Sequence, residues 1–210
     1  MRYIVIPFSI VFILLLTVIT SAFCDQKDIE LGKEIFFDKN LSANKNQSCA
    51  ECHGEACGWT GPDEQINKTG AVYEGSFTNR FGNRKPGSCS YASLSPVFSY
   101  DKEKGFSGGN FWDGRATGWK LGDPTADQAQ GPPLNPLEQA LSNENEVMKL
   151  VCNATYGKAF KQFFGSKSCN EPSTGFNQVA VSLFRFEFSQ QVNNCSPAKQ
   201  DVTTVILWIK

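Results

Sequence analysis

The chain has 210 residues, of which 40% are apolar, 12% aromatic and 20% charged, and these fractions are typical of folding proteins rather than of disordered ones. Its 20 lysines and arginines nearly balance its 21 aspartates and glutamates, so neither nucleic acid nor an anionic membrane surface is an expected partner. The single histidine excludes any metal site that needs two histidines from this chain.

Residues 1–23 have the order of features found in secretory signal peptides. A basic residue comes early, an apolar run from Ile4 to Ile19 follows, and small residues end the segment. We therefore expect an exported mature chain, cleaved after Ala22 or Cys24. Two alternatives stay open, because the run could instead be a membrane anchor, although a proline interrupts it, and Cys24 could carry a lipid.

The segment after Asp25 is predicted to be helical, because four residues recur at helical spacing, namely Ile29, Gly32, Ile35 and Phe36. Asp25 or Asp28 can accept hydrogen bonds from its first turn. From Asn40 to Gly122 the chain is rich in Gly, Asn, Ser and Pro and shows little periodicity, which predicts long ordered loops. Such loops need something other than regular secondary structure to hold them, and a cofactor would do so.

The following half is predicted to be a layer of helices. Asp123 and Pro124 are typical of a helix start, and Gly131 with the two prolines after it is expected to end that helix. Ser142 is expected to cap a second helix, and Thr155 to open a third that ends at Gly165. A fourth helix is predicted from the spacing of Phe176, Val179, Ala180, Leu183 and Phe184. We expect the phenylalanines here to form a core rather than a ligand pocket.

Residues 49–53 read Cys-Ala-Glu-Cys-His, which is the C-x-x-C-H motif. Two thiols one helical turn apart can add to the two vinyl groups of haem, and the next residue can turn its imidazole onto the iron. A redox dithiol or half of a zinc site is the alternative, but export and the adjacent histidine favour haem. We therefore predict one covalent haem c, held by Cys49 and Cys52, with His53 as the iron ligand.

The opposite face of that iron is expected to be open. His53 is the only histidine, and Met148 is the only methionine after the predicted signal peptide. A methionine at an apolar helical position is usually part of a core. An open face suits the activation of a small oxidant better than electron transfer alone.

Three ordered motifs resemble the bacterial di-haem cytochrome c peroxidases and the related MauG enzymes. The first comprises residues 31–42 with 48–53, the second is Phe-Trp-Asp-Gly-Arg-Ala at 111–116, and the third spans residues 128–138. The resemblance covers only the amino-terminal haem domain of that family. It implies a mainly α, cytochrome c-like haem domain with long ordered loops over residues 25–196, leaving residues 197–210 as an unmatched apolar tail.

The resemblance also implies roles for individual residues. His53 matches the proximal ligand of the peroxidatic haem, and Gln128, Pro132 and Glu138 match residues of its distal pocket. Glu138 is the acid–base candidate, since a carboxylate beside an open ferric iron can take a proton from peroxide and return it to the leaving oxygen. Gln128 could orient peroxide, and Pro132 would shape the pocket without an amide donor.

Two residues of the second motif also match the family. Trp112 resembles the tryptophan placed between the two haems. Arg115 is a candidate partner for a haem propionate, because a guanidinium group matches a carboxylate bidentately.

The sequence departs from the family in having one C-x-x-C-H motif and no distal histidine. A truncated gene and a natural one-haem protein both remain open, and the missing histidine places the chain nearer the MauG type. Half of the family's calcium site would be absent, so no metal besides iron is predicted. Without the family's second haem domain, the apolar surface that this domain normally covers would be exposed, and this favours association with another subunit.

Five further cysteines lie outside the motif and the predicted signal region, at positions 57, 89, 152, 169 and 195. In an oxidising compartment, proximity in the sequence favours pairing of Cys57 with Cys89 and of Cys152 with Cys169.

These inferences together favour a periplasmic c-type haem peroxidase-like protein. Hydrogen peroxide would be its substrate, and a small cytochrome or cupredoxin would donate electrons. The alternative is a one-haem electron-transfer cytochrome, or a haem-binding remnant without turnover, in which Met148 or another group closes the iron. A spectrum of haem with an open iron face would support the peroxidase, and a spectrum with a sulfur-to-iron band would support the electron-transfer cytochrome.

Overall fold

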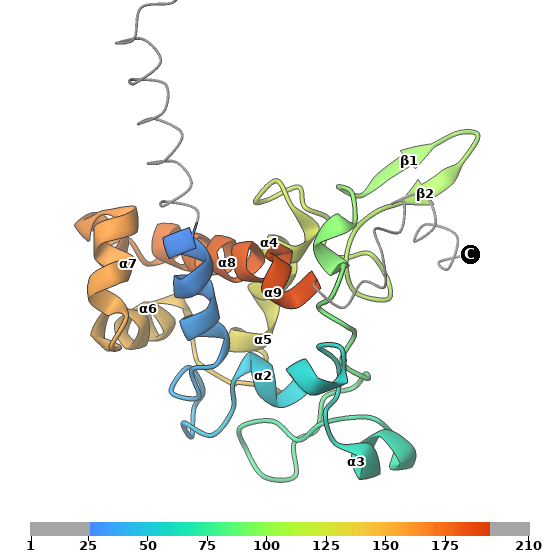
Figure 1. The fold of residues 1–210 in the computed structure, drawn as a ribbon, viewed down its shortest axis with the longest axis horizontal. Coiled ribbons are helices and arrows are strands. Elements are labelled where there is room, and N and C mark those ends of the chain that lie inside the picture. Colours follow the sequence, from blue (N-terminus) through green and yellow to red (C-terminus); the bar gives the residue numbers. More distant parts are fainter. Residues whose placement is uncertain (1–25, 194–210) are drawn as a thin grey trace, which may run out of the picture.

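The fold is mainly helical, as the sequence predicts, in a computed structural model that describes residues 26–193 (Figure 1). The predicted signal peptide, its cleavage site and the tail at 197–210 lie outside these residues. The described residues begin with a helix over residues 26–36. The elements after it are α2 (Cys49–Cys52), η1 (Glu55–Cys57), α3 (Glu64–Thr69), η2 (Ala92–Leu94), β1 (Ser99–Asp101), β2 (Gly105–Ser107), α4 (Pro124–Ala129), α5 (Gly131–Leu134), α6 (Glu144–Asn153), α7 (Gly157–Phe164), η3 (Ser166–Cys169), α8 (Pro172–Phe188) and α9 (Gln190–Asn193).

Helix α8 is at the centre of the helical layer and packs against α4 and α6. The helix over residues 26–36 also contacts α8, and a Cβ atom at Gly32 would lie only 2.0 Å from the carbonyl oxygen of Ser182. Glycine at this position therefore allows the two helix backbones to approach closely. Ser182 Oγ also donates a 2.9 Å hydrogen bond to Asp28 Oδ1, which ties the same two helices together.

Aromatic side chains fill the core, as expected from the sequence. Phe160, Phe176 and Phe186 are all at most 2% exposed. Phe36, Trp59 and Phe186 meet edge to face, with ring centroids 5.2–5.7 Å apart. Met148 is 2% exposed, and its terminal methyl carbon would lie 2.6 Å from a Cβ atom at Gly175 in α8. The prediction that Met148 is a core residue is confirmed.

The helix starts are close to the predicted positions but differ in detail. Asp123 caps α4 as expected, because its side chain accepts a hydrogen bond from the backbone N–H of Thr125. Helix α6 is capped by Asn143 rather than by Ser142. Gly131 and the prolines after it do not simply end α4 but form the short helix α5, since proline is tolerated in the first turn of a helix.

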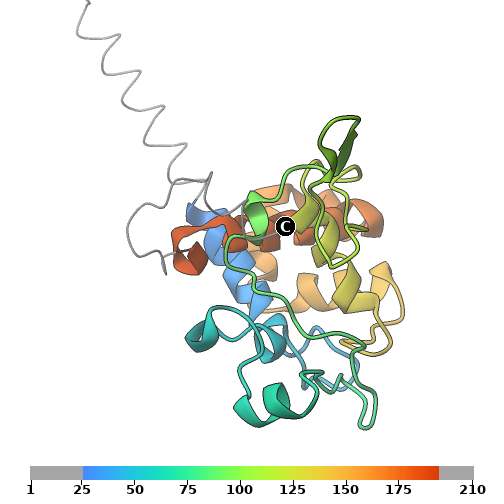
Figure 2. The same ribbon diagram turned by 90° about the vertical axis from the view of Figure 1, so that its right-hand side faces the viewer.

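Segment 40–122 consists largely of loops, with only short elements inserted. The strands β1 and β2 form an antiparallel hairpin in which Tyr100 faces Phe106, an element that the sequence reasoning did not predict. Figures 1 and 2 both place α3 and the β1–β2 hairpin at opposite ends of the molecule, with α8 between them. The loops of segment 40–122 therefore extend past both ends of the helical layer.

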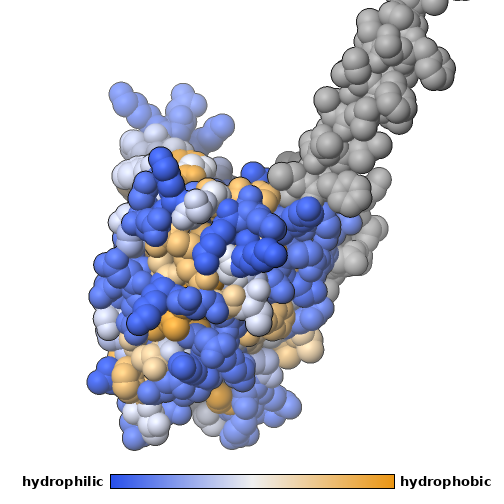
Figure 3. All heavy atoms as spheres, turned by 90° about the vertical axis from the view of Figure 1, so that its left-hand side faces the viewer, coloured by the Kyte–Doolittle hydropathy of each residue, from blue (hydrophilic) through white to orange (hydrophobic). Residues whose placement is uncertain are grey.

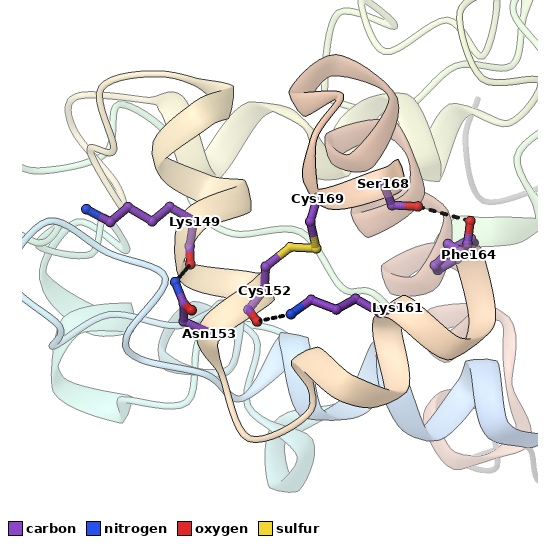
Figure 4. Close-up of a disulfide and its surroundings, with 7 residues drawn as sticks. All are labelled: Lys149, Cys152, Asn153, Lys161, Phe164, Ser168 and Cys169. Atoms are coloured by element: carbon purple, nitrogen blue, oxygen red, sulfur yellow. Dashed lines mark hydrogen bonds between the residues drawn. A yellow bond between two sulfur atoms is a disulfide. The ribbon is translucent and has the colours of Figure 1, made fainter. Parts of the chain in front are cut away.

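A disulfide bond joins Cys152 at the end of α6 to Cys169 in η3, and this prediction is confirmed (Figure 4). Lys161 Nζ donates a 3.0 Å hydrogen bond to the carbonyl oxygen of Cys152, beside the bridge. The predicted bond between Cys57 and Cys89 is wrong, since both cysteines are free. Cys57 is exposed on η1, whereas Cys89 is buried, so proximity in the sequence did not bring the two thiols together.

Large exposed aromatic side chains gather at the hairpin end of the molecule. Phe106 is 72% exposed, Trp119 71% and Tyr100 62%. On the face seen in Figure 3, which is turned toward α6 and α7, apolar areas are small and are interrupted by hydrophilic residues. Within residues 26–193, no helix combines the length and apolar character needed to cross a membrane.

Candidate functional site

All of the site residues predicted from the sequence line two adjoining cavities, with volumes of about 290 and 50 Å³. Five of these predicted residues line both cavities, namely Cys52, His53, Gln128, Pro132 and Glu138. Cys49 lines the smaller cavity, and Trp112 and Arg115 line the larger one. Side chains up to 89 positions apart in the sequence, from Cys49 to Glu138, therefore meet in one place.

Helix α2 is a single turn that holds both motif cysteines. The backbone N–H of His53 donates a 2.9 Å hydrogen bond to the carbonyl oxygen of Cys49, which closes this turn. Both thiols are free and half-buried. Burial raises the pKa of Cys52 to about 11, and Gln47 Nε2, 3.6 Å from its sulfur, opposes that shift. Burial likewise raises the pKa of Cys49, so both side chains are neutral thiols at pH 7.

The imidazole of His53 is oriented by two backbone carbonyl groups. Its Nδ1 lies 2.9 Å from the oxygen of Gly87 and 3.2 Å from the oxygen of Trp59. Because a carbonyl can only accept, the hydrogen is assigned to Nδ1, which leaves Nε2 with a free lone pair. Burial lowers the pKa of His53, so the neutral ring is favoured. This is the arrangement of a metal-ligating histidine whose second nitrogen is anchored.

Glu138 lies just after α5, at the wall shared by both cavities. Its Oε1 accepts a 2.8 Å hydrogen bond from Asn135 Nδ2. Burial raises the pKa of Glu138, while Asn135 and the charge of Arg115 oppose the shift. A Cβ atom at Gly75 would lie only 2.8 Å from the carbonyl oxygen of Glu138. Glycine at position 75 therefore lets the loop that contains it pack closely against the backbone of Glu138.

The remaining predicted residues line the same cavity as Glu138. Gln128 stands on α4, and Pro132 lies in the first turn of α5 without an N–H to offer. Trp112 is 76% exposed, at the cavity rim. Arg115 lines the larger cavity and pairs with Asp113, since its Nη1 lies 2.8 and 2.9 Å from the two carboxylate oxygens of that residue. Its guanidinium carbon also lies 3.8 Å from the ring centroid of Phe111.

Two buried groups in the cavity were not singled out by sequence reasoning. Glu187 in α8 and Cys89 line both cavities and are hydrogen-bonded to each other. Burial raises the pKa of Glu187 to about 8 and raises that of Cys89 as well. A lone acid among the phenylalanines at 184, 186 and 188 was the available signal, because an unpaired acid is rare on a buried helix face.

The residues present fit a covalently attached haem. Two free thiols one turn apart and a histidine with a free Nε2 share one cavity. Ser48 Oγ and Gln139 Oε1 are buried in the wall of the smaller cavity, and among residues 26–193 neither has a hydrogen-bond partner. Since buried polar atoms are normally paired, these two indicate that the cavity is shaped for an additional group.

Comparison with known proteins finds relatives among the haem peroxidases. The family model described as di-haem cytochrome c peroxidase matches residues 26–202. The methylamine utilization protein MauG of Paracoccus denitrificans is 36% identical over 159 residues, which are 75% of this chain and 39% of MauG. Cytochrome c peroxidase Ccp of Escherichia coli is 32% identical over 164 residues, 75% of this chain and 30% of that protein.

A solved structure supports the fold. The diheme peroxidase BthA from Burkholderia thailandensis superposes with a TM-score of 0.71 at 24% identity, over 79% of this chain and 39% of BthA. This likeness shows that the helical fold is that of a diheme peroxidase domain. The chain belongs to the di-haem cytochrome c peroxidase family. It spans less than half the length of these relatives.

Proposed function

We propose that this chain is a c-type haem domain that reduces hydrogen peroxide in the periplasm, using electrons from a small cytochrome or cupredoxin. The observation that carries the proposal is the position of Glu138, whose carboxyl group shares a cavity with the C-x-x-C-H motif. Two relatives support the choice of reaction by their names, cytochrome c peroxidase Ccp of Escherichia coli and cytochrome c551 peroxidase of Nitrosomonas europaea.

Three residues would hold the haem. Cys49 and Cys52 would form thioether bonds with it, and His53 Nε2 would bind its iron. When bound, haem would supply redox chemistry at an iron accessible to peroxide. The hydrogen bonds from Nδ1 to Gly87 and Trp59 keep the His53 ring in place and make it a stronger donor.

Glu138 would move the proton. Reduction of peroxide consumes two electrons and two protons and yields two water molecules, so a proton must leave one peroxide oxygen and reach the other. The Asn135 hydrogen bond fixes one carboxyl oxygen of Glu138 and leaves Oε2 for this transfer. Because burial raises its pKa, this carboxylate accepts a proton more readily than an exposed glutamate does.

Neighbouring side chains would orient the substrate and admit electrons. The amide of Gln128 can donate a hydrogen bond to peroxide, whereas Pro132 has no N–H that would compete for it. Exposed Trp112 lies between solvent and the cavity, where a donor protein could approach.

The test is the substitution Glu138→Gln in the haem-loaded full chain. Glutamine keeps the size of the side chain but cannot accept the proton, so we expect peroxide reduction to slow by about 100-fold or more. The matched control is Glu103→Gln, at an exposed hairpin residue, which should leave the rate unchanged. Pyridine haemochrome spectra should show the same covalent haem content in all three proteins.

Two results would contradict the proposal. Equal rates for wild type and Glu138→Gln would remove Glu138 from proton transfer. A wild-type chain with covalent haem, a low-spin spectrum and no peroxide turnover would assign it to electron transfer instead.

A further inference from the structure

Segment 82–88 forms part of the wall of the larger cavity and is tied to the C-x-x-C-H region. The carbonyl oxygen of Pro86 accepts a 2.7 Å hydrogen bond from Thr60 Oγ1. The next carbonyl, that of Gly87, is the 2.9 Å partner of His53 Nδ1. The backbone of this loop is therefore fixed relative to the imidazole that would bind iron.

Arg84 and Lys85 stand on this loop and line the larger cavity. Both side chains are exposed, and within residues 26–193 neither has a hydrogen-bond or ion-pair partner. Arg115, the third cation in the cavity wall, differs because Asp113 neutralises it at 2.8 Å. The loop thus brings two adjacent positive charges to the cavity without a counter-charge from the described part of the protein.

The acids of the cavity do not supply that counter-charge. Glu138 is bonded to Asn135, and Glu187 is bonded to Cys89. Burial raises the pKa of both carboxyl groups, which favours their neutral forms, and neither shift includes a contribution from Arg84 or Lys85. An anion that enters the cavity from outside would complete the site.

Haem carries two propionates on the edge of the macrocycle away from the vinyl groups that react with cysteine. We propose that Arg84 and Lys85 bind these two propionates, one cation to each carboxylate. The inference rests on the proposed function, since it requires haem at Cys49 and Cys52. Arg84 can bind a carboxylate bidentately and Lys85 acts as a point charge.

Two cations at the propionates would stabilise reduced haem, because reduction adds a negative charge near them. The loop would then link the haem edge to the iron ligand, because Gly87 holds His53 and lies only two residues from Lys85. Removing the cations should therefore lower the midpoint potential of the haem without affecting its covalent attachment.

The experiment compares R84Q/K85Q with wild type and with the control K102Q/K104Q, in full-length haem-loaded protein. The control removes the same charge from exposed hairpin residues that do not line the cavity. We expect R84Q/K85Q to lower the haem midpoint potential and to shift the propionate bands in reduced-minus-oxidised infrared spectra. Each single variant should produce part of the shift, and the control should produce none.

The outcomes separate this inference from the proposed function. If R84Q/K85Q matches the control in both potential and infrared bands, the propionate assignment is overturned and the proposed function stands. A change only in KM for the donor protein would also overturn it, because the cations would then serve protein docking. Wild-type protein without covalent haem would overturn both.

Discussion

At the scale of single residues, the least expected group is the buried acid Glu187. Its side chain lies on the apolar helix α8 and accepts a hydrogen bond from the Cys89 thiol, and in the described part of the chain no cation pairs with it. Burial raises its pKa from 4.5 to about 8, so the folded chain holds a proton that the unfolded chain releases at neutral pH. Haem in the cavity would exclude more water and so raise the pKa of Glu187 further.

This difference makes stability depend on pH. Below pH 4.5 both states are protonated at Glu187, and between pH 4.5 and about 8 only the folded state is. Unfolding therefore becomes easier as pH rises, by up to about 1.4 kcal/mol per pH unit from this group. Glu187→Gln should flatten that slope in urea unfolding between pH 5 and 8. Glu103→Gln should keep the wild-type slope, and an unchanged slope in Glu187→Gln would refute the assignment.

The residues of the cavity were predictable to different degrees. Cys49, Cys52 and His53 follow from a local motif, because their spacing alone places them on one helical turn. Glu138 and Gln128 required the resemblance to a family, since nothing in their immediate sequence distinguishes them from surface residues. The contact between Cys89 and Glu187 could not be predicted from the sequence, because it forms only when α8 packs against the loops of segment 40–122.

At the scale of elements, side-chain capping decided which predictions were accurate. Asp123 starts α4 as predicted. At α6, Ser142 and Asn143 are both good caps by residue type, and only the backbone geometry selects Asn143. The hairpin β1–β2 was missed because each strand is only three residues long and is stabilised by aromatic contacts such as Tyr100 with Phe106.

The disulfide between α6 and η3 is expected to stabilise the helical layer. It closes a loop of 17 residues, for which the restriction of the unfolded chain is worth about 3 kcal/mol. Replacing Cys152 and Cys169 together by alanine should lower the free energy of unfolding in urea by about that amount, while Cys57→Ala, at an exposed free thiol, should change it little. Equal stability of the double variant and wild type would mean that the bridge does not form in solution.

At the scale of the whole molecule, the two ends of the domain differ in character. The face toward α6 and α7 is mostly hydrophilic with small apolar areas (Figure 3), whereas the hairpin and the following loop expose Tyr100, Phe106 and Trp119. Contiguous exposed aromatic surface is uncommon on a monomer and marks an interaction site. The helical core itself does not require this surface, because Phe160, Phe176 and their neighbours are already buried.

We therefore expect association through the hairpin end. Tyr100 and Phe106 pack on each other with ring centroids 4.9 Å apart and are 62% and 72% exposed, so burying them against another surface would release a large apolar area from water. Sedimentation velocity over a range of concentrations should show self-association of the wild type and a shift toward monomer in Tyr100→Ser/Phe106→Ser. Lys102→Gln, in the same hairpin, should behave as wild type. A wild-type chain that stays monomeric at high concentration would show that these rings do not drive self-association.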